Sequence, residues 1–405
     1  MYNFCFFILL AVYFSELLFP PLTAFTPSST ICLLCFFGWI LLSVLYDKKY
    51  YQRMNIGRFF SLLFYFFSFL MPYFFGYKMI AHRYMTLPLV PFGFLVYSFH
   101  KDHNQDGLIS RIIKLCIILS TITALITTIA LFENAYVSRS IKSGGDLSRA
   151  LAYRGIGGYS LIYFGAICSV LLLHCLLNAK NTMTKFVGLT VFLIDVLLII
   201  KSNYMTAVLV CLVEIVVYIA LTVYNKNRKS FVGFFGCVSI IVIISLLFVN
   251  YGNELAQYLP SRIADTITLS QKGIIKAIID EFFIDRWPVM EESIISFIEH
   301  PLFGLIGSGG IGNANGFLTG FGQHSYILDT FALYGLFVGI YIPKMLLEPF
   351  KTTNKKLKPL EISCLVGMLL IYFFNNATES IALAIGFIFP YVRDRFGIEK
   401  DEKKG

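Results

Sequence analysis

The chain has 405 residues, of which 57% are hydrophobic and 14% charged, and its formal net charge is +9. So apolar a composition, with a mean hydropathy of +0.73, excludes a soluble globular enzyme and requires a membrane around most of the chain. The positive charge gathers in short loops between apolar segments, so it requires no nucleic-acid partner. The nine cysteines fall in apolar segments, which indicates packing residues and neither disulfides nor a metal site.

Apolar runs of about 20 residues recur along the chain, and each predicts a helix that crosses the bilayer. We expect an all-α polytopic membrane protein with about 12 transmembrane helices, built as a single integral membrane domain over residues 1–405. The expected helices lie at about 3–23, 28–46, 57–77, 85–99, 110–132, 159–178, 185–200, 204–224, 231–249, 324–343, 361–375 and 379–392. The first is expected to stay in the protein, because it lacks the basic leader and the cleavage pattern of a signal peptide.

Clusters of Lys and Arg alternate with nearly uncharged loops. The basic clusters are Lys48–Arg53, Lys226–Lys229 and Lys355–Lys358. Because cytoplasmic loops carry the excess of positive charge, both termini are expected to be cytoplasmic. This orientation places two long loops, about 133–158 and 250–323, outside the cytoplasm. The second is too long for a plain connector, so we expect it to contain short helices and functional residues.

The loop at about 133–158 is basic and ends in a glycine-rich stretch. It contains Arg139 and Arg149, and Arg154 stands directly before Gly155–Gly158. Glycine backbone amides and a guanidinium can approach a phosphate together. The loop therefore suits a polyanionic or pyrophosphate ligand. The alternative is that Arg154 anchors the chain at the membrane surface.

Arg286 lies in the second long loop, within the stretch Asp285–Pro288. If residues 278–299 form one helix, the positions three and four residues away are apolar, so no carboxylate pairs with Arg286 on that face. If Asp285 instead caps a helix whose first turn contains Pro288, Arg286 lies at the positive end of the helix dipole, where anions bind. In both geometries the guanidinium is expected to bind an anion on the outer side of the membrane. The alternative is a solvated surface arginine.

His324 begins the expected span 324–343 at its outer end. Histidine both takes and gives a proton near neutral pH, so His324 is a candidate base for a sugar hydroxyl. The alternative is a structural histidine that is held by hydrogen bonds.

The late loop and the helix after it carry an ordered set of motifs. In chain order these are Arg286-Trp287, His300-Pro301-Leu302-Phe303-Gly304, a glycine-rich run, His324-Ser325-Tyr326 and Tyr334-Gly335-Leu336. This order resembles the signature of the O-antigen polymerase and O-antigen ligase superfamily over about residues 286–340. Thr378-Glu379-Ser380 also resembles a polar motif of the family near its last helix. The chain departs from the family pattern at Ser325, where asparagine commonly follows the histidine.

The resemblance implies a glycosyltransferase that uses undecaprenyl-pyrophosphate-linked glycans at the outer face of the bacterial cytoplasmic membrane. On that analogy Arg154 and Arg286 hold the pyrophosphate leaving group. His324 deprotonates the attacking hydroxyl in an inverting step that needs no metal and no other cofactor. The further residues expected to contact substrate are Arg139, Arg149, Tyr326 and Glu379.

Within the superfamily we favour a polymerase, whose acceptor is another lipid-linked repeat unit, over a ligase, which transfers the glycan to a different acceptor. A polymerase of this kind would work with a flippase and a chain-length regulator. The alternative from another class is a carrier, such as a lipid-linked oligosaccharide flippase, that uses the span residues Glu16, Asp195 and Glu214. Repeat halves, which many transporters have, are not evident. A non-catalytic scaffold would leave the outer arginines unexplained.

Overall fold

The computed structural model describes residues 2–25, 28–52, 89–141, 145–226, 286–305, 312–314, 317–319, 321–322, 324–340, 346–351, 358–375 and 381–396. The regular elements in these ranges are helices and one short β-hairpin. The chain divides into two compact units, and the single integral membrane domain stays a prediction. The first unit comprises residues 1–198, 344–351 and 378–405, and the second comprises residues 199–343 and 352–377.

Four helices of the described residues are long and apolar enough to cross a bilayer, so this is a membrane protein. They are α7 (Asp106–Glu133), α10 (Tyr159–Asn178), α11 (Thr182–Lys201) and α12 (Met205–Lys226). Each agrees with an expected transmembrane helix to within about a turn at either end. The expected helices 57–77 and 231–249 lie outside the described residues, and the total of about 12 spans stays a prediction.

The first expected helix, 3–23, is divided in the structure. α1 (Tyr2–Leu18) ends before Pro20-Pro21, and the short helix α2 (Pro20–Phe25) begins there. Proline has no N–H to continue the hydrogen-bond ladder of α1, and its ring clashes with the preceding turn. The proline pair therefore ends the helix inside a run that hydropathy reads as continuous.

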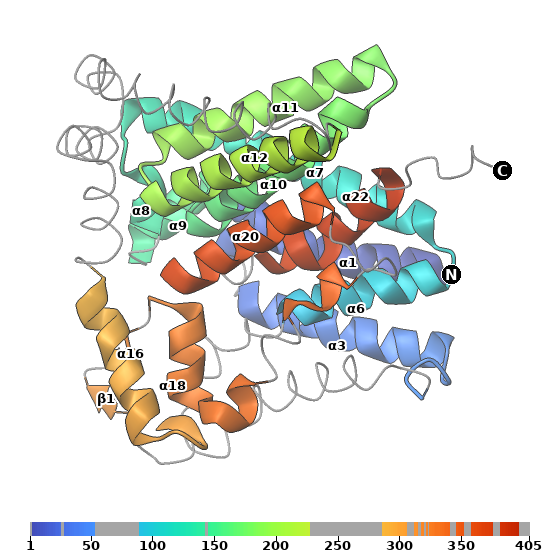
Figure 1. Ribbon diagram of the computed structural model, residues 1–405. Coiled ribbons are helices and arrows are strands. Elements are labelled where there is room, and N and C mark those ends of the chain that lie inside the picture. Colours follow the sequence, from blue (N-terminus) through green and yellow to red (C-terminus); the bar gives the residue numbers. More distant parts are fainter. Residues whose placement is uncertain are drawn as a thin grey trace. The chain divides into compact units, whose positions relative to one another are not determined.

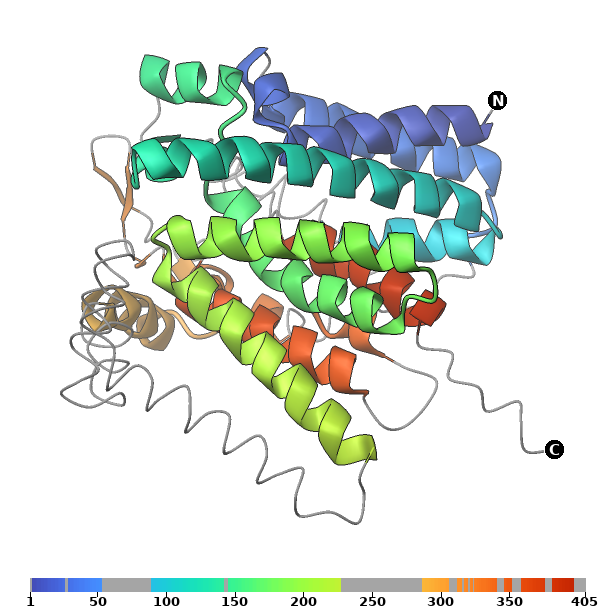
Figure 2. The same cartoon turned by 90° about the horizontal axis from the view of Figure 1, so that it is seen from above.

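In the first unit, α1 packs against α3 (Ser28–Tyr46) and α7, and Figure 2 shows these helices in blue and teal. Elsewhere in the unit, glycines let two helices approach closely. The elements involved are α6 (Leu89–Asp102) and the π-helical η4 (Ala382–Ile388), which continues into α22 (Phe389–Phe396). A Cβ on Gly93 would lie 2.8 Å from the carbonyl oxygen of Ala382, so glycine is needed for this approach.

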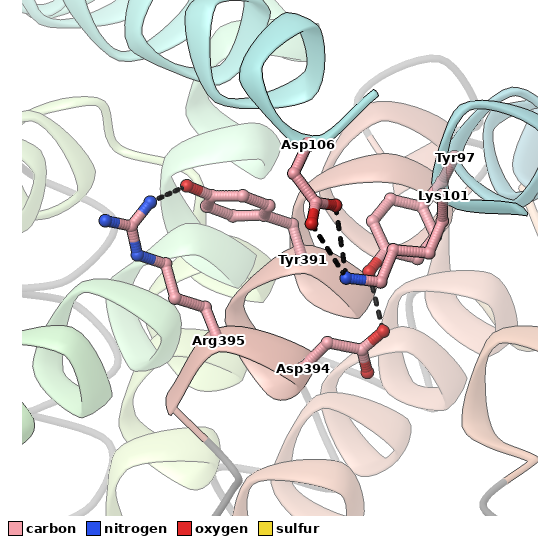
Figure 3. A network of polar contacts seen from close by, with 6 residues as sticks. All are labelled: Tyr97, Lys101, Asp106, Tyr391, Asp394 and Arg395. Atoms are coloured by element: carbon pink, nitrogen blue, oxygen red, sulfur yellow. Dashed lines mark hydrogen bonds and ion pairs between the residues drawn. The ribbon is translucent and has the colours of Figure 1, made fainter. Parts of the chain in front are cut away.

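Polar contacts surround the end of α6 (Figure 3). Tyr97 Oη donates to Asp394 Oδ2 of α22 at 2.6 Å, and Lys101 Nζ donates to Asp106 Oδ1 at the start of α7 at 3.1 Å. Within α22, Arg395 donates to the hydroxyl of Tyr391. The expected topology places these helix ends on the cytoplasmic side.

His100, just after the expected span 85–99, shows how the first unit buries a polar group. Trp39 Nε1 donates to His100 Nε2 at 3.1 Å, so the ring proton is on Nδ1, which lies 2.6 Å from Gln105 Oε1. Gln105 Nε2 in turn donates to Asn3 Oδ1 at 2.9 Å. Burial lowers the pKa of His100 to about 4, although the hydrogen bond to Gln105 opposes this shift. The imidazole is therefore neutral at pH 7.

The second unit contains two helix pairs (Figure 1). The pairs are α12 with α20 (Pro359–Phe374), and α16 (Trp287–Glu299) with α18 (Tyr326–Gly339). Hydrogen bonds connect Arg286 to the start of α12 and to the end of α20, so these two helices are antiparallel. Between α16 and α18 the chain forms an antiparallel hairpin of β1 (Gly312–Ala314) and β2 (Phe317–Thr319), with Asn313 opposite Leu318.

Candidate functional site

Arg286 is the N-cap residue of α16, which begins at Trp287. Of the two geometries that the sequence allows, the structure has a helix start, with Pro288 in the first turn, where its missing N–H costs nothing. The first amides of a helix lack partners within it, so the start of α16 carries partial positive charge beside Arg286. In this geometry the sequence predicts Asp285 as the cap, but the N-cap residue is Arg286; Asp285 itself lies outside the described residues.

The guanidinium of Arg286 ties two other helices to the start of α16. Nη1 donates to the main-chain oxygen of Phe374 in the last turn of α20, and Nη2 donates at 3.1 Å to Thr206 Oγ1 in the first turn of α12. A cation is favourable at the carbonyl end of a helix because the dipole is negative there. Arg286 thus has a structural role that the sequence did not predict. The same contacts fix the plane of the guanidinium, which two-point binding of an anion requires.

The His300–Gly304 and Tyr334–Leu336 motifs contact each other. Gly304 and Gly335 both have φ of +64°, and a Cβ on either would overlap main-chain atoms of the other motif's segment. Leu336 N donates to Pro301 O at 2.8 Å across the contact. Both positions require glycine, because other residues rarely adopt this conformation and there is no room for a side chain. Gly335 also interrupts the helical conformation of α18.

A buried serine of α16 joins this helix to the segment that carries His324. Gly322 N donates to Ser293 Oγ at 2.9 Å, and Ser293 Oγ donates to Asp329 Oδ1 of α18 at 2.7 Å. Ser293 is 1% exposed and Asp329 is 2% exposed. A Cβ on Gly322 would overlap the carbonyl of Val289, so the main chain lies directly against α16 here. Hydrogen bonds therefore connect α16, Gly322 and the first turn of α18.

His324 is exposed and stands just before α18, which Ser325 caps. Leu328 N donates to Ser325 Oγ at 3.3 Å, and Asp329 N donates to Ser325 O at 2.8 Å. Serine and asparagine are both favoured N-cap residues. The departure from the family pattern at Ser325 thus keeps the helix cap beside the histidine.

Tyr326, expected to contact substrate, is buried in the second unit. Its ring stacks on Tyr372 of α20 with centroids 4.4 Å apart, and its N–H donates to Asn375 O at 3.3 Å. In the structure Tyr326 packs α18 against α20. A role in contacting substrate stays a prediction.

Arg154 is exposed in the first unit, directly after the last residue of α9 (Gly145–Tyr153). The glycine stretch behind it packs on α7: Gly155 has φ of +78°, and Gly157 N donates to Thr127 Oγ1 at 2.7 Å. The sequence predicts glycine amides that face a phosphate. The amide of Gly157 is instead bonded to α7, and the guanidinium of Arg154 is the exposed group of this stretch.

The other arginines of the first long loop lie near Arg154 in the chain. Arg149 is exposed on α9, and Arg139 is half-buried in α8 (Val137–Ser140), which contacts α9. These three arginines belong to the first unit, whereas Arg286 and His324 belong to the second, where Arg286 stands at the start of α16 and Gly322, two residues before His324, is bonded to that helix. Glu379 lies outside the described residues.

Two of the carboxylates in the expected spans face glycines. Glu214 of α12 is fully buried, and neither of its carboxylate oxygens has a hydrogen-bond partner among the described residues. Gly367 of α20 makes room for it, since a Cβ there would overlap the Glu214 carboxylate. Asp195 of α11 is buried opposite Gly165 of α10, whose Cβ would lie 3.8 Å from the Asp195 carboxyl carbon. Glu16 is buried in α1.

The sequence did not single out Ser293 or Asp329. Asp329 is an ionisable residue within the expected span 324–343, and the reasoning that selects Glu214 would also have selected it. Ser293 gives no such signal, because its partners lie 29 and 36 positions away in the chain. Spacing along α16 does not show which distant amide or carboxylate the hydroxyl meets.

Among the described residues, no group of three His, Cys, Asp or Glu side chains could hold a metal ion. No protein-family model, curated protein or solved structure matches the chain.

Proposed function

We propose that the protein is a polysaccharide polymerase of the bacterial cytoplasmic membrane. It transfers an undecaprenyl-pyrophosphate-linked glycan to a sugar hydroxyl of another lipid-linked repeat unit. The donor, the acceptor and the bilayer are its partners in the reaction. Both termini are cytoplasmic in this proposal, and the reacting groups are on the outer side.

The observation that supports the proposal best is the attachment of Arg286 and His324 to one helix. Arg286 is the N-cap residue of α16, and Ser293 of the same helix binds the main chain of Gly322, two residues before His324. A cation at a helix N-terminus is suited to a diphosphate, and an exposed imidazole is suited to accept a proton. These two groups match the leaving diphosphate and the attacking hydroxyl of a transfer from a lipid diphosphate.

In the proposed reaction, a hydroxyl oxygen of the acceptor forms a bond to the anomeric carbon of the donor glycan. The bond between that carbon and the diphosphate oxygen breaks, and its electron pair leaves with undecaprenyl diphosphate. His324 takes the hydroxyl proton, while Arg286 offsets the charge on the leaving group, a role that the resemblance also gives to Arg154. Attack on the face opposite the leaving group inverts the configuration. The proton, the electron pair and the leaving group are all accounted for without a metal or a nucleotide.

The direct test uses purified protein in liposomes with a lipid-diphosphate-linked repeat unit and a chelator, and without nucleotide sugar. Wild type should elongate the glycan, read as a ladder of lengths on a gel. His324→Ala should slow elongation by about 10²- to 10⁴-fold, the usual contribution of a general base. The matched control is His300→Ala in the same unit. His300 is the C-cap residue of α16 and bonds to the helix through its main-chain N–H, which alanine keeps.

Each result has a separate meaning. Elongation by His324→Ala at the wild-type rate would remove His324 from catalysis. An active wild-type preparation that transfers glycan to a different acceptor, and not to a second repeat unit, would identify a ligase. Wild type that transfers to neither acceptor would overturn the proposal.

The arginines are tested by changes that keep the charge. Lysine lacks the planar fork of arginine, so Arg286→Lys and Arg154→Lys should shorten the polymer made in cells. Arg111→Lys, an exposed arginine of α7, is the control and should make polymer of normal length. Polymer of wild-type length from all three, at equal protein amounts, would reduce Arg286 and Arg154 to structural anchors.

A carrier of lipid-linked oligosaccharide is the second candidate, and the environment of Glu214 favours it. A buried carboxyl in a spanning helix, with no hydrogen-bond partner among the described residues, is typical of a transport pathway. A carrier would move lipid-linked units between leaflets of the same liposomes without elongating them. In a carrier, Glu214→Gln should stop this movement. A polymerase should still elongate the glycan when it carries Glu214→Gln.

A further inference from the structure

The hydroxyl of Ser293 donates one hydrogen bond and accepts another. It accepts the N–H of Gly322 at 2.9 Å and donates to Asp329 Oδ1 at 2.7 Å. Because Asp329 is 2% exposed, its carboxylate would face a large desolvation cost without such a donor. Serine is the smallest side chain that supplies both functions. The carboxylate thus fixes the rotamer of Ser293, and Ser293 fixes Gly322.

The same helix carries Arg286. Ser293 lies seven residues after Arg286, which is about two turns and about 10 Å along the axis on the same face. An α-helix of this length is rigid, so a group bound to Ser293 is held at a constant distance from the start of α16. Gly322 is the bound group, and His324 follows it by two residues.

Main-chain contact reinforces the hydrogen bond. A Cβ on Gly322 would overlap the carbonyl of Val289, one turn before Ser293. The chain at Gly322 is therefore in contact with α16 at both Val289 and Ser293. Asp329 N also donates to Ser325 O at 2.8 Å, which connects the carboxylate-bearing turn to the residue after His324.

We propose that Ser293 and Asp329 are positioning residues that hold His324 in place relative to Arg286. The proposal rests on the proposed function, in which Arg286 binds the diphosphate and His324 takes the proton. Neither Ser293 nor Asp329 needs to touch substrate. Their contribution is to keep the proton acceptor and the anion site at the separation that the transfer requires.

The first measurement does not depend on activity. Hydrogen exchange of a peptide that contains Gly322 should become about tenfold faster in Ser293→Ala, because the amide loses its acceptor. Asp329→Ala should have a smaller effect in the same direction, since Ser293 stays but loses the carboxylate that orients it. Ser296→Ala, a second buried serine of α16, is the control and should leave this exchange unchanged.

The second measurement separates positioning from folding. In the elongation assay, Ser293→Ala should lower kcat by about 10²-fold with KM nearly unchanged, since a misplacement of about 1 Å costs this much. Ser293→Thr, which keeps a hydroxyl at this position, should retain most of the wild-type rate. Equal losses from Ser293→Thr and Ser293→Ala would indicate a packing role and overturn the proposal.

Failure of this inference and failure of the proposed function are distinguishable. If wild type does not elongate, the proposed function fails while the exchange measurement still reports the contact. If wild type elongates and Ser293→Ala changes neither the exchange of Gly322 nor kcat, the positioning role is excluded. Faster exchange of Gly322 without a change in kcat would also exclude the positioning role, because catalysis by His324 would then not depend on a fixed Gly322.

Discussion

In both helix pairs of the second unit, glycine allows a close contact, but the atoms that fill the space differ. In the α16–α18 pair, main chain meets main chain where the segment after α16, at Gly304, contacts Gly335 of α18, and buried polar groups of the two helices bond to each other. In the α12–α20 pair, a side chain meets glycine: Gly367 makes room for Glu214, whose carboxylate oxygens have no hydrogen-bond partner among the described residues.

The difference separates a fixed contact from an adjustable one. Main-chain atoms in contact cannot relax by a change of rotamer, whereas a glutamate side chain has several rotamers. The α16–α18 pair is therefore suited to hold catalytic groups in place. Arg286 connects the two pairs, since it caps α16 and binds an end of both α12 and α20.

The largest effect is expected at a main-chain contact. Gly304→Ala would place a Cβ on the main chain of Leu333 and force a non-glycine residue to φ of +64°. Overpacking and backbone strain together should cost about 3 kcal/mol or more. The measurement is the midpoint of thermal unfolding in detergent.

The control for this change is Gly107→Ala in α7, where a Cβ would have no atom within 4 Å. This variant should be as stable as wild type or more so, because alanine favours helix by about 1 kcal/mol. A Gly304→Ala protein that unfolds at the wild-type temperature would show that the α16–α18 contact is not fixed.

A smaller effect is expected at the adjustable contact. Gly367→Ala would overlap the Glu214 carboxylate, which is fully buried and must move against its neighbours, at a cost of about 2 kcal/mol. Glu214→Ala removes the overlapping atoms, so Gly367→Ala should cost much less in that background. A double-mutant cycle of unfolding midpoints measures this coupling.

Gly188→Ala in α11 is the matched control, because its Cβ would meet one side-chain atom at an ordinary 3.8 Å. It should show no coupling to Glu214→Ala. An equal cost for Gly367→Ala with and without Glu214 would mean that the glycine is required by the helix backbones and not by the carboxyl.

The local features of this fold could be predicted from the sequence more readily than the distant ones. Hydropathy placed α10 at the bounds that the structure has, and Pro288 gave a helix start beside Arg286 as one of two geometries. Both signals lie within one helix or one turn. The break at Pro20-Pro21 also had a local signal, which the hydropathy reading did not use.

The contacts of the candidate site could not be predicted in this way. The partners of Arg286 lie 80 and 88 positions away in the chain, so a prediction of its environment would need the packing of α12, α16 and α20. The motif order identified Gly304 and Gly335, but it did not show that their segments touch. Distant pairings depend on the whole fold, and the sequence supplies them only through resemblance.

The smallest effect is expected where Arg286 joins the two pairs. Thr206→Val keeps the branched shape of the side chain but removes the acceptor that Arg286 Nη2 uses at 3.1 Å. The guanidinium retains its bond to Phe374 O, so the loss should be about one hydrogen bond, about 1 kcal/mol. Thr222→Val, the same change in the same helix where the hydroxyl donates to Tyr218 O, should cost less because that bond is local.

The activity of the two threonine variants then indicates what the Thr206 contact does for the site. If it fixes the plane of the guanidinium for a diphosphate, Thr206→Val should slow elongation more than its small loss of stability explains, and Thr222→Val should not. Equal rates in both variants would mean that Arg286 orients an anion without Thr206. The bond to Thr206 would then serve the packing of α12 against the start of α16, and the bond to Phe374 O would be the contact that orients the guanidinium.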